Sequence, residues 1–258
     1  MLSPFRGHRR RRLRATPISE EWRAIVRRNV PLYRRLSAEQ QRELEGHVQV
    51  LLAEKHFEGA GGLELTDEIR VTIAAHAALL LLGREPSYYP ALYTIVVYPS
   101  IYSAPVENAE EGGIVEEGLE ERLGESWQRG VIVLAWDAAR AGARCMDDGE
   151  NVILHEFAHQ LDEETGTADG TPYLDSRSQY RSWARVLGAE LDQLRERGSS
   201  GVLDEYGAEN PSEFFAVATE AFFERPADLE RRHPALYGEL SRFYRLDLAK
   251  TGGEAASD

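Results

Sequence analysis

Hydrophobic residues recur at helical spacing over most of the chain. In the N-terminal third, apolar residues every three or four positions predict helices with N-caps at Ser19, Ser37 and Thr66. The helix after Thr66, at residues 67–82, is apolar nearly all round, which is typical of a buried helix. The same spacing predicts further helices at residues 137–142, 151–162, 176–197, 210–223 and 233–244.

The pattern changes in the middle of the chain, where short runs are rich in β-branched and aromatic residues. Residues 92–98 and 130–136 have this composition, and the first run ends at Pro99, as strands often do. Residues 114–118 form a weaker run of the same kind. A few strands among many helices predict an α+β fold with a small mixed sheet.

The two ends of the chain are polar and are expected to be disordered. Residues 1–15 carry six arginines and no following apolar stretch, so they do not read as a signal peptide. Contact of this basic tail with nucleic acid or an anionic surface is an alternative. Residues 249–258 are rich in Gly, Ala, Ser and acid. Between them, residues 16–248 are expected to form a single domain, with a helical part at about 16–85.

Composition and charge narrow the class of protein. The 258 residues carry a formal net charge of −14, which disfavours direct contact with nucleic acid. No run of about 18 apolar residues is present, so no membrane contact is expected and a cytoplasmic location is predicted. The single cysteine, Cys145, excludes an internal disulfide and leaves histidines and carboxylates as ligands for any metal.

One predicted helix carries the pattern His-Glu-x-x-His. Residues four apart share a helix face, so His155 and His159 can bind one metal ion, and Glu156 can reach a water on that ion. Two imidazoles and a carboxylate suit a catalytic zinc site. The alternative is two core histidines beside a surface glutamate, but a buried helix rarely carries such groups without a partner.

A third ligand must come from elsewhere, since no further histidine motif follows His159. Glu213 and Glu220 are seven apart in one predicted apolar helix, so they share a side of it, and each needs a partner there. Asp162, three after His159, is expected to accept a ring N–H from a ligating histidine and fix its tautomer. The alternative for Asp162 is a surface acid at the helix end.

Two motifs carry a resemblance to a known family. They are HEFAHQLD at residues 155–162 and NPSEFFAV at 210–217, with weaker matches at 130–137 and 148–152. The chain resembles the Mlc titration factor A family of bacterial zinc peptidases over roughly residues 20–247. That family in turn resembles the catalytic domain of anthrax lethal factor, a gluzincin.

The resemblance implies roles for particular residues. In that gluzincin a tyrosine precedes the glutamate ligand by seven positions, and Tyr206 stands seven before Glu213. Glu213 is thereby implied as the third ligand of one Zn²⁺ ion, Tyr206 as a donor to the oxyanion, and Glu220 as a supporting residue. The resemblance also implies a gluzincin-like core, aminopeptidase-like hydrolysis of short peptides, and binding to a Mlc-type transcriptional repressor.

Two other functions remain open from the sequence. One is a non-catalytic protein-binding regulator with a structural zinc site, and the other is a metal-dependent hydrolase of non-peptide substrates. A structural site would be closed by four protein ligands, whereas the sequence offers three.

Overall fold

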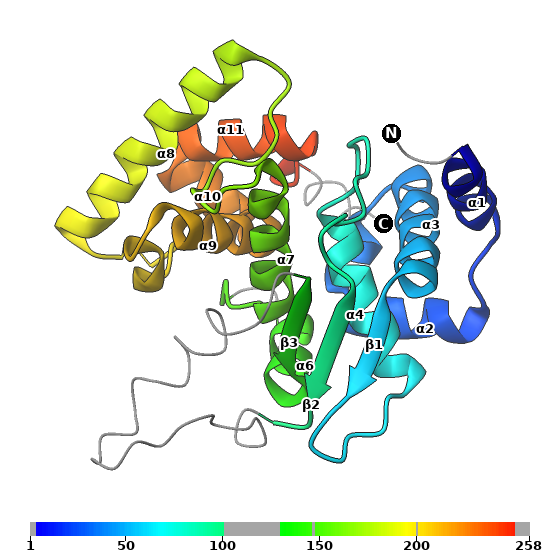
Figure 1. Ribbon diagram of the computed structural model, residues 1–258. Helices are drawn as coiled ribbons and strands as arrows, with labels where there is room; N and C mark the ends of the chain where they lie inside the picture. The colour runs from blue at the N-terminus through cyan, green and yellow to red at the C-terminus, as the bar shows by residue number, and fades with distance from the viewer. Residues whose placement is uncertain (1–3, 101–129, 146–147, 200, 251–258) are drawn as a thin grey trace, which may run out of the picture.

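A small parallel sheet lies near the middle of the molecule. The computed structural model describes residues 4–100, 130–145, 148–199 and 201–250 (Figure 1). Strands pair in the order β1-β2-β3, and β2 is central. The strands are β1 (His56–Gly59), β2 (Thr94–Tyr98) and β3 (Val131–Ala135).

The N-terminal helices gather on one side of this sheet (Figure 1). They are α1 (Pro4–Ala15), α2 (Glu20–Asn29), η1 (Pro31–Arg35), α3 (Ala38–Glu54) and α4 (Asp67–Leu79). Helix α4 follows β1 and precedes β2, as the crossover between parallel strands requires. It packs on α2, α3, α6 and α7 at once, which explains why its sequence is apolar nearly all round.

The helix starts predicted in this part are confirmed. The Ser19 side chain accepts from the Trp22 N–H, and the Thr66 side chain accepts from the Ile69 N–H. Ser37 forms a capping box with Gln40: its side-chain oxygen accepts from the Gln40 N–H at 3.2 Å, and its own backbone N–H donates to Gln40 Oε1 at 2.9 Å. Each cap satisfies backbone donors that the first turn of a helix leaves free.

The arginine-rich N-terminal segment is a helix and not the disordered tail that was expected. Arg10 is buried and donates from Nε and Nη2 to both carboxylate oxygens of Glu54, at 2.9 and 2.7 Å. Its guanidinium also lies 4.5 Å from the centre of the Tyr88 ring. Glu54 ends α3 and Tyr88 follows α4, so both partners are distant in sequence and the local composition of α1 could not reveal them.

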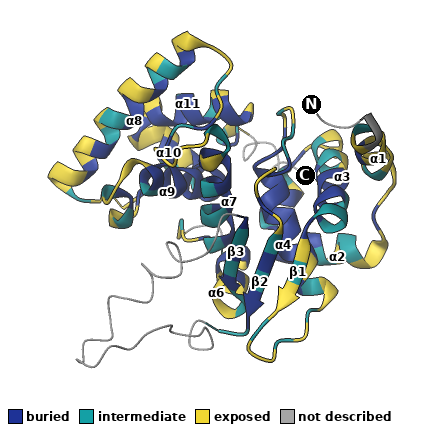
Figure 2. Cartoon of the chain, in the orientation of Figure 1, coloured by how far each residue is buried: buried dark blue, intermediate teal, exposed yellow. Residues whose placement is uncertain are grey.

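The C-terminal helices gather on the opposite side, with α7 between the two groups (Figure 1). Helix α9 packs against α7, α8, α10 and α11, and Figure 2 shows it buried while α8 exposes one face. The helices of this C-terminal group are η3 (Glu163–Thr165), α8 (Arg177–Arg197), η4 (Glu205–Ala208), α9 (Pro211–Glu224), α10 (Pro226–Arg232) and α11 (Pro234–Tyr244), and α7 (Val152–Asp162) separates them from the N-terminal helices. Helix α6 (Trp136–Arg144) lies outside this group and packs against β3, α2, α4 and α7.

The α+β prediction is confirmed in its coarse form, since the described chain is mostly helical with a small sheet. The described strands all pair in parallel, so a mixed sheet is not seen among them. The weaker strand predicted at 114–118 lies outside the described residues. Helix α10 was missed because Pro226 reads as a breaker, whereas it occupies the first turn, where a missing N–H costs little.

Both groups of helices contribute to one hydrophobic core. Its buried side chains run from Ile18 on the N-terminal side to Leu248 near the other end of the described chain. None of the described helices combines the length and the hydrophobicity that a membrane span needs.

Candidate metal centre

Helices α7 and α9 lie against each other and bring the predicted ligands together. The His155 Nε2 atom lies 3.0 Å from Glu213 Oε2, and the His159 Nε2 atom lies 3.2 Å from the same oxygen. The two Nε2 atoms are 3.1 Å apart. Donors held about 2 Å from one tetrahedral zinc ion are about 3.3 Å from each other, so the cluster has the right size and donor set.

The ends of both helices position these ligands. Asn151 caps α7 by accepting from the Leu154 N–H, and the residues that follow bury their apolar side chains, which leaves His155 and His159 half-buried on the other face. Asn210 caps α9 by accepting from the N–H of Ser212 and of Glu213, at 2.9 and 3.0 Å. The cap therefore fixes the backbone of the carboxylate ligand itself.

A buried carboxylate supports the first histidine. The Nδ1 atom of His155 lies 2.7 Å from Glu220 Oε1, and Glu220 Oε2 accepts the backbone N–H of Asn151 at 2.5 Å. With Nδ1 donating to Glu220, the Nε2 lone pair is left for a metal ion. The spacing of seven therefore places Glu213 and Glu220 on the two nitrogens of one imidazole ring.

A hydroxyl supports the second histidine. The Nδ1 atom of His159 lies 3.0 Å from Ser212 Oγ, and Ser212 Oγ donates to Asp162 Oδ2 at 2.8 Å. Asp162 also accepts the backbone N–H groups of Gly170 and Thr171, at 2.8 and 2.7 Å. The expected direct bond from Asp162 to a ligand ring is therefore wrong, because Ser212 stands between them.

Sequence reasoning missed Ser212 as a member of the site. Its position directly before Glu213 in the first turn of α9 was the available signal, since that turn faces α7. A serine there also reads as an ordinary helix-start residue, so the signal was weak.

The electrostatics of the cluster favour a positive charge. Burial lowers the pKa of His155, but its bonds to Glu213 and Glu220 outweigh that effect and raise the pKa to about 10. Burial likewise raises the pKa of Glu213, and its bonds to His155 and His159 bring the pKa down to about 2. Two carboxylates around the imidazoles thus create a place for a cation, which a divalent ion supplies when bound.

Glu156 and Tyr206 also lie at the cluster. Glu156 is half-buried, and it forms no hydrogen bond or ion pair with the residues that the structure describes. Burial raises the pKa of Glu156, which moves it toward the range that suits a proton acceptor near neutral pH. The ring of Tyr206 lies 6.0 Å from the ring of His155, centre to centre, and Asp204 holds the Tyr206 N–H at 2.8 Å.

Comparison with known proteins agrees with this centre. The chain matches the family model described as glucose-regulated metallo-peptidase M90 over residues 5–245. It is 41% identical over 243 residues to the uncharacterized protein slr2042 of Synechocystis, covering 93% of this chain and 88% of that protein. It is 32% identical over 225 residues to Mlc titration factor A of Yersinia pestis, covering 85% and 82%, and equally to that of Yersinia pseudotuberculosis. The chain therefore belongs to the glucose-regulated metallo-peptidase M90 family.

Proposed function

We propose that this protein is a zinc-dependent peptidase of the gluzincin type. The observation that carries the proposal is the convergence of His155 Nε2, His159 Nε2 and Glu213 Oε2, all within hydrogen-bond distance of one another. Three protein ligands leave a position open on a tetrahedral ion, which distinguishes catalytic zinc from structural zinc. When bound, zinc supplies a water of lowered pKa and polarises the carbonyl of the substrate.

The residues around the metal ligands have separate roles in the proposed reaction. Glu156 accepts the proton of the attacking water and returns it to the leaving amine, for which its half-buried carboxylate and raised pKa are suited. The Tyr206 hydroxyl donates to the carbonyl oxygen as negative charge develops there. Glu220 orients His155 directly, and Asp162 orients His159 through Ser212.

The substrate is proposed to be a peptide bound in extended form. Strand β3 is at the edge of the described sheet and contacts α7, which carries both histidines. An edge strand offers backbone donors and acceptors to a chain lying beside it. Pairing with β3 would lay a peptide next to the metal centre, and aminopeptidase-like cleavage of short peptides is the form of activity that we propose.

A regulatory role through a Mlc-type transcriptional repressor is proposed as well. Its support is the similarity to proteins named Mlc titration factor A, over 85% of this chain. The alternative is that binding such a partner is the whole function and that zinc is structural. Hydrolysis is favoured by a donor set of three protein ligands, and by a Glu156 carboxylate that has no hydrogen-bond partner among the described residues. We place both activities in the cytoplasm.

The Glu156→Gln variant tests the proposal. It is expected to keep one zinc ion per chain and to lose hydrolysis by at least about 100-fold, because general-base catalysis typically contributes that much. Release of product from a panel of chromogenic peptides measures turnover, and atomic absorption measures zinc. Glu196→Gln, an exposed acid of α8, is the matched control and should keep full activity.

Two outcomes would overturn the proposal. Undiminished turnover by the Glu156→Gln variant would remove the assigned base. A wild-type protein that holds zinc, cleaves none of the peptides and binds a repressor would favour the non-catalytic regulator.

A further inference from the structure

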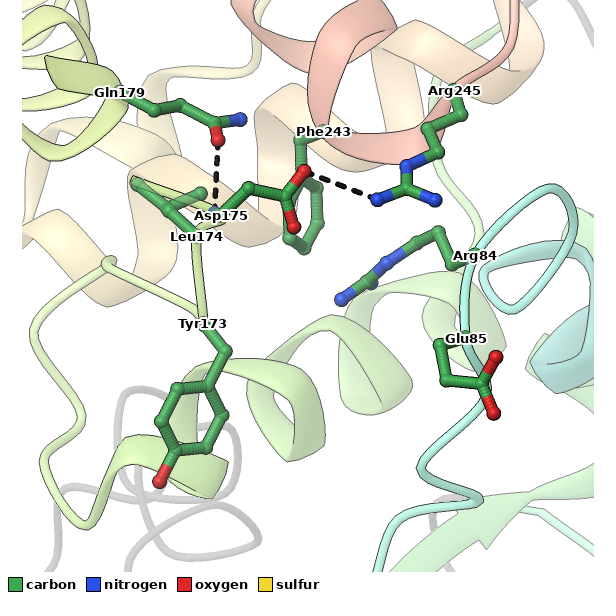
Figure 3. A pocket seen from close by; sticks show the side chains of 8 residues that line it. All are labelled: Arg84, Glu85, Tyr173, Leu174, Asp175, Gln179, Phe243 and Arg245. Atoms are coloured by element: carbon green, nitrogen blue, oxygen red, sulfur yellow. Dashed lines mark hydrogen bonds and ion pairs between the residues drawn. The ribbon is translucent and has the colours of Figure 1, made fainter. Parts of the chain in front are cut away.

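A second site that could receive a ligand lies away from the metal ligands. A cavity of about 180 Å³ opens between the loop after α4, the segment before α8 and the end of α11 (Figure 3). Charged and polar side chains dominate its lining, among them Arg84, Asp175, Gln179 and Arg245. That volume accommodates several waters or one small polyatomic ion.

Arg84 is the unusual member of this lining. Its guanidinium stacks on the Phe243 ring, 4.0 Å from the ring centre, and points into the cavity in Figure 3. Its Nη1 atom is shielded from solvent and has no hydrogen-bond partner among the described residues. The nearby Glu164 carboxylate is engaged by the Ser87 hydroxyl at 2.5 Å. The Glu164 charge attracts Arg84, but no hydrogen bond joins the two side chains in the described part of the structure, so the Nη1 donors stay unsatisfied. A buried donor without a hydrogen-bond partner is costly and is poised to gain one from a ligand.

Arg245 brings a second guanidinium to the same space. It stands at the end of α11 in the left-handed region, with φ of 54°, and its Nη2 atom lies 3.1 Å from Asp175 Oδ2. Both side chains of this pair are largely in water, at 52% and 71% exposure, so the pair contributes little and exchanges readily. Figure 3 shows the Glu85 carboxylate pointing away from both guanidinium groups.

We propose that this cavity binds a small oxyanion, a carboxylate or a phosphate, between Arg84 and Arg245. A guanidinium presents parallel N–H groups that match two oxygens of such an ion, and stacking on Phe243 fixes the plane of Arg84. Asp175 then exchanges its arginine partner for water at little cost. Because Glu85 and Asp175 balance the charge of the lining, attraction at long range is weak and the site selects by contact geometry.

The test uses the full-length protein with inorganic phosphate and with acetate, at an ionic strength held constant by sodium chloride. Thermal unfolding and titration calorimetry measure binding without any reference to hydrolysis. Saturating anion is expected to raise the Tm of the wild type by about 5 °C. The larger response, to phosphate or to acetate, identifies which oxyanion the site prefers.

Three variants locate the site. Arg84→Met should abolish the response while leaving the Tm without anion unchanged or higher, since it removes a partly buried guanidinium whose Nη1 atom has no hydrogen-bond partner among the described residues. Arg84→Lys keeps a charge without the paired N–H groups and should weaken binding about tenfold. Arg242→Gln, an exposed arginine of α11 outside the cavity lining, is the control and should respond like the wild type.

The proposal is overturned if neither anion raises the Tm of the wild type beyond the effect of chloride. It is also overturned if Arg84→Met, or Arg84→Lys where the first variant does not fold, keeps the full response.

Discussion

The two histidines of the metal centre are held by different kinds of group. His155 Nδ1 lies 2.7 Å from a carboxylate oxygen of Glu220, whereas His159 Nδ1 lies 3.0 Å from the hydroxyl of Ser212. Charge-assisted hydrogen bonds are shorter and roughly twice as strong as neutral ones. Helix α9 therefore supports one imidazole with a full charge and the other with a dipole.

The difference extends to the surroundings of each support. Glu220 also accepts the backbone N–H of Asn151, so the residue that orients His155 also holds the start of α7. On the other side the negative charge of Asp162 stands one residue further away, behind Ser212, where two backbone N–H groups bind it. The comparison indicates that the His155 side contributes more to metal affinity and is more sensitive to loss of charge.

Replacing Glu220 is expected to have the largest effect. Glu220→Gln keeps the shape of the side chain but removes the charge that faces His155 Nδ1. Loss of such a supporting carboxylate weakens metal binding by about 10- to 100-fold, and turnover should fall with zinc occupancy. Competition against a chromophoric chelator measures the affinity. A change of less than about twofold would show that the charge on this side is unimportant.

Replacing Ser212 is expected to have a smaller effect. Ser212→Ala removes one neutral hydrogen bond to His159, which is worth about 1 kcal/mol, so zinc affinity should fall about fivefold. The same chelator assay measures it, with the exposed Ser178→Ala on α8 as control. If Ser212→Ala weakened binding as much as Glu220→Gln, the distinction between the two sides would be wrong.

The sequence predicts the metal-ligating residues of the site better than the residues that orient those ligands. Helix α7 and the pair His155 and His159 follow from local spacing, because a helix fixes the relation of residues four apart. Glu213 required the family resemblance, since nothing local says which distant carboxylate turns toward the histidines. The relay through Ser212 depends on how α9 packs against α7, which no pattern within either helix contains.

In the fold as well, features that depend on neighbouring residues were predicted, and features that depend on distant residues were missed. The caps at Ser19, Ser37 and Thr66 were predictable because each acts within one turn of helix. Strand β1 was missed because its four residues, which include a glycine, pair only with the distant β2. The ordered helix α1 was missed for the same reason, because Arg10 is held by Glu54, which lies in another helix.

The smallest expected effect concerns an acid one turn beyond Glu220. Glu224 is buried, and its Oε1 atom accepts from Asn151 Nδ2 at 2.9 Å. Burial raises the pKa of Glu224 to about 8, the bond to Asn151 opposes this, and the charges of Glu220 and Asp148 add to it. The folded protein therefore keeps a proton that the unfolded chain releases above its ordinary pKa of 4.5.

The sign of the pH effect follows from that difference. Because the folded state binds this proton more tightly, the contribution of Glu224 to the free energy of unfolding is fully present below pH 4.5 and is lost as the pH rises toward 8. Glu224→Gln keeps an acceptor for Asn151 and removes the titration. The variant should unfold at nearly the wild-type Tm at low pH and a few degrees higher above pH 8, with zinc affinity almost unchanged. Thermal scans across this range, with the exposed Glu230→Gln as control, measure the difference. If the Tm of Glu224→Gln followed pH as the wild-type Tm does, the Glu224 carboxylate would not be the source of the pH dependence. The contrast between the His155 side and the His159 side would then depend on Glu220 alone.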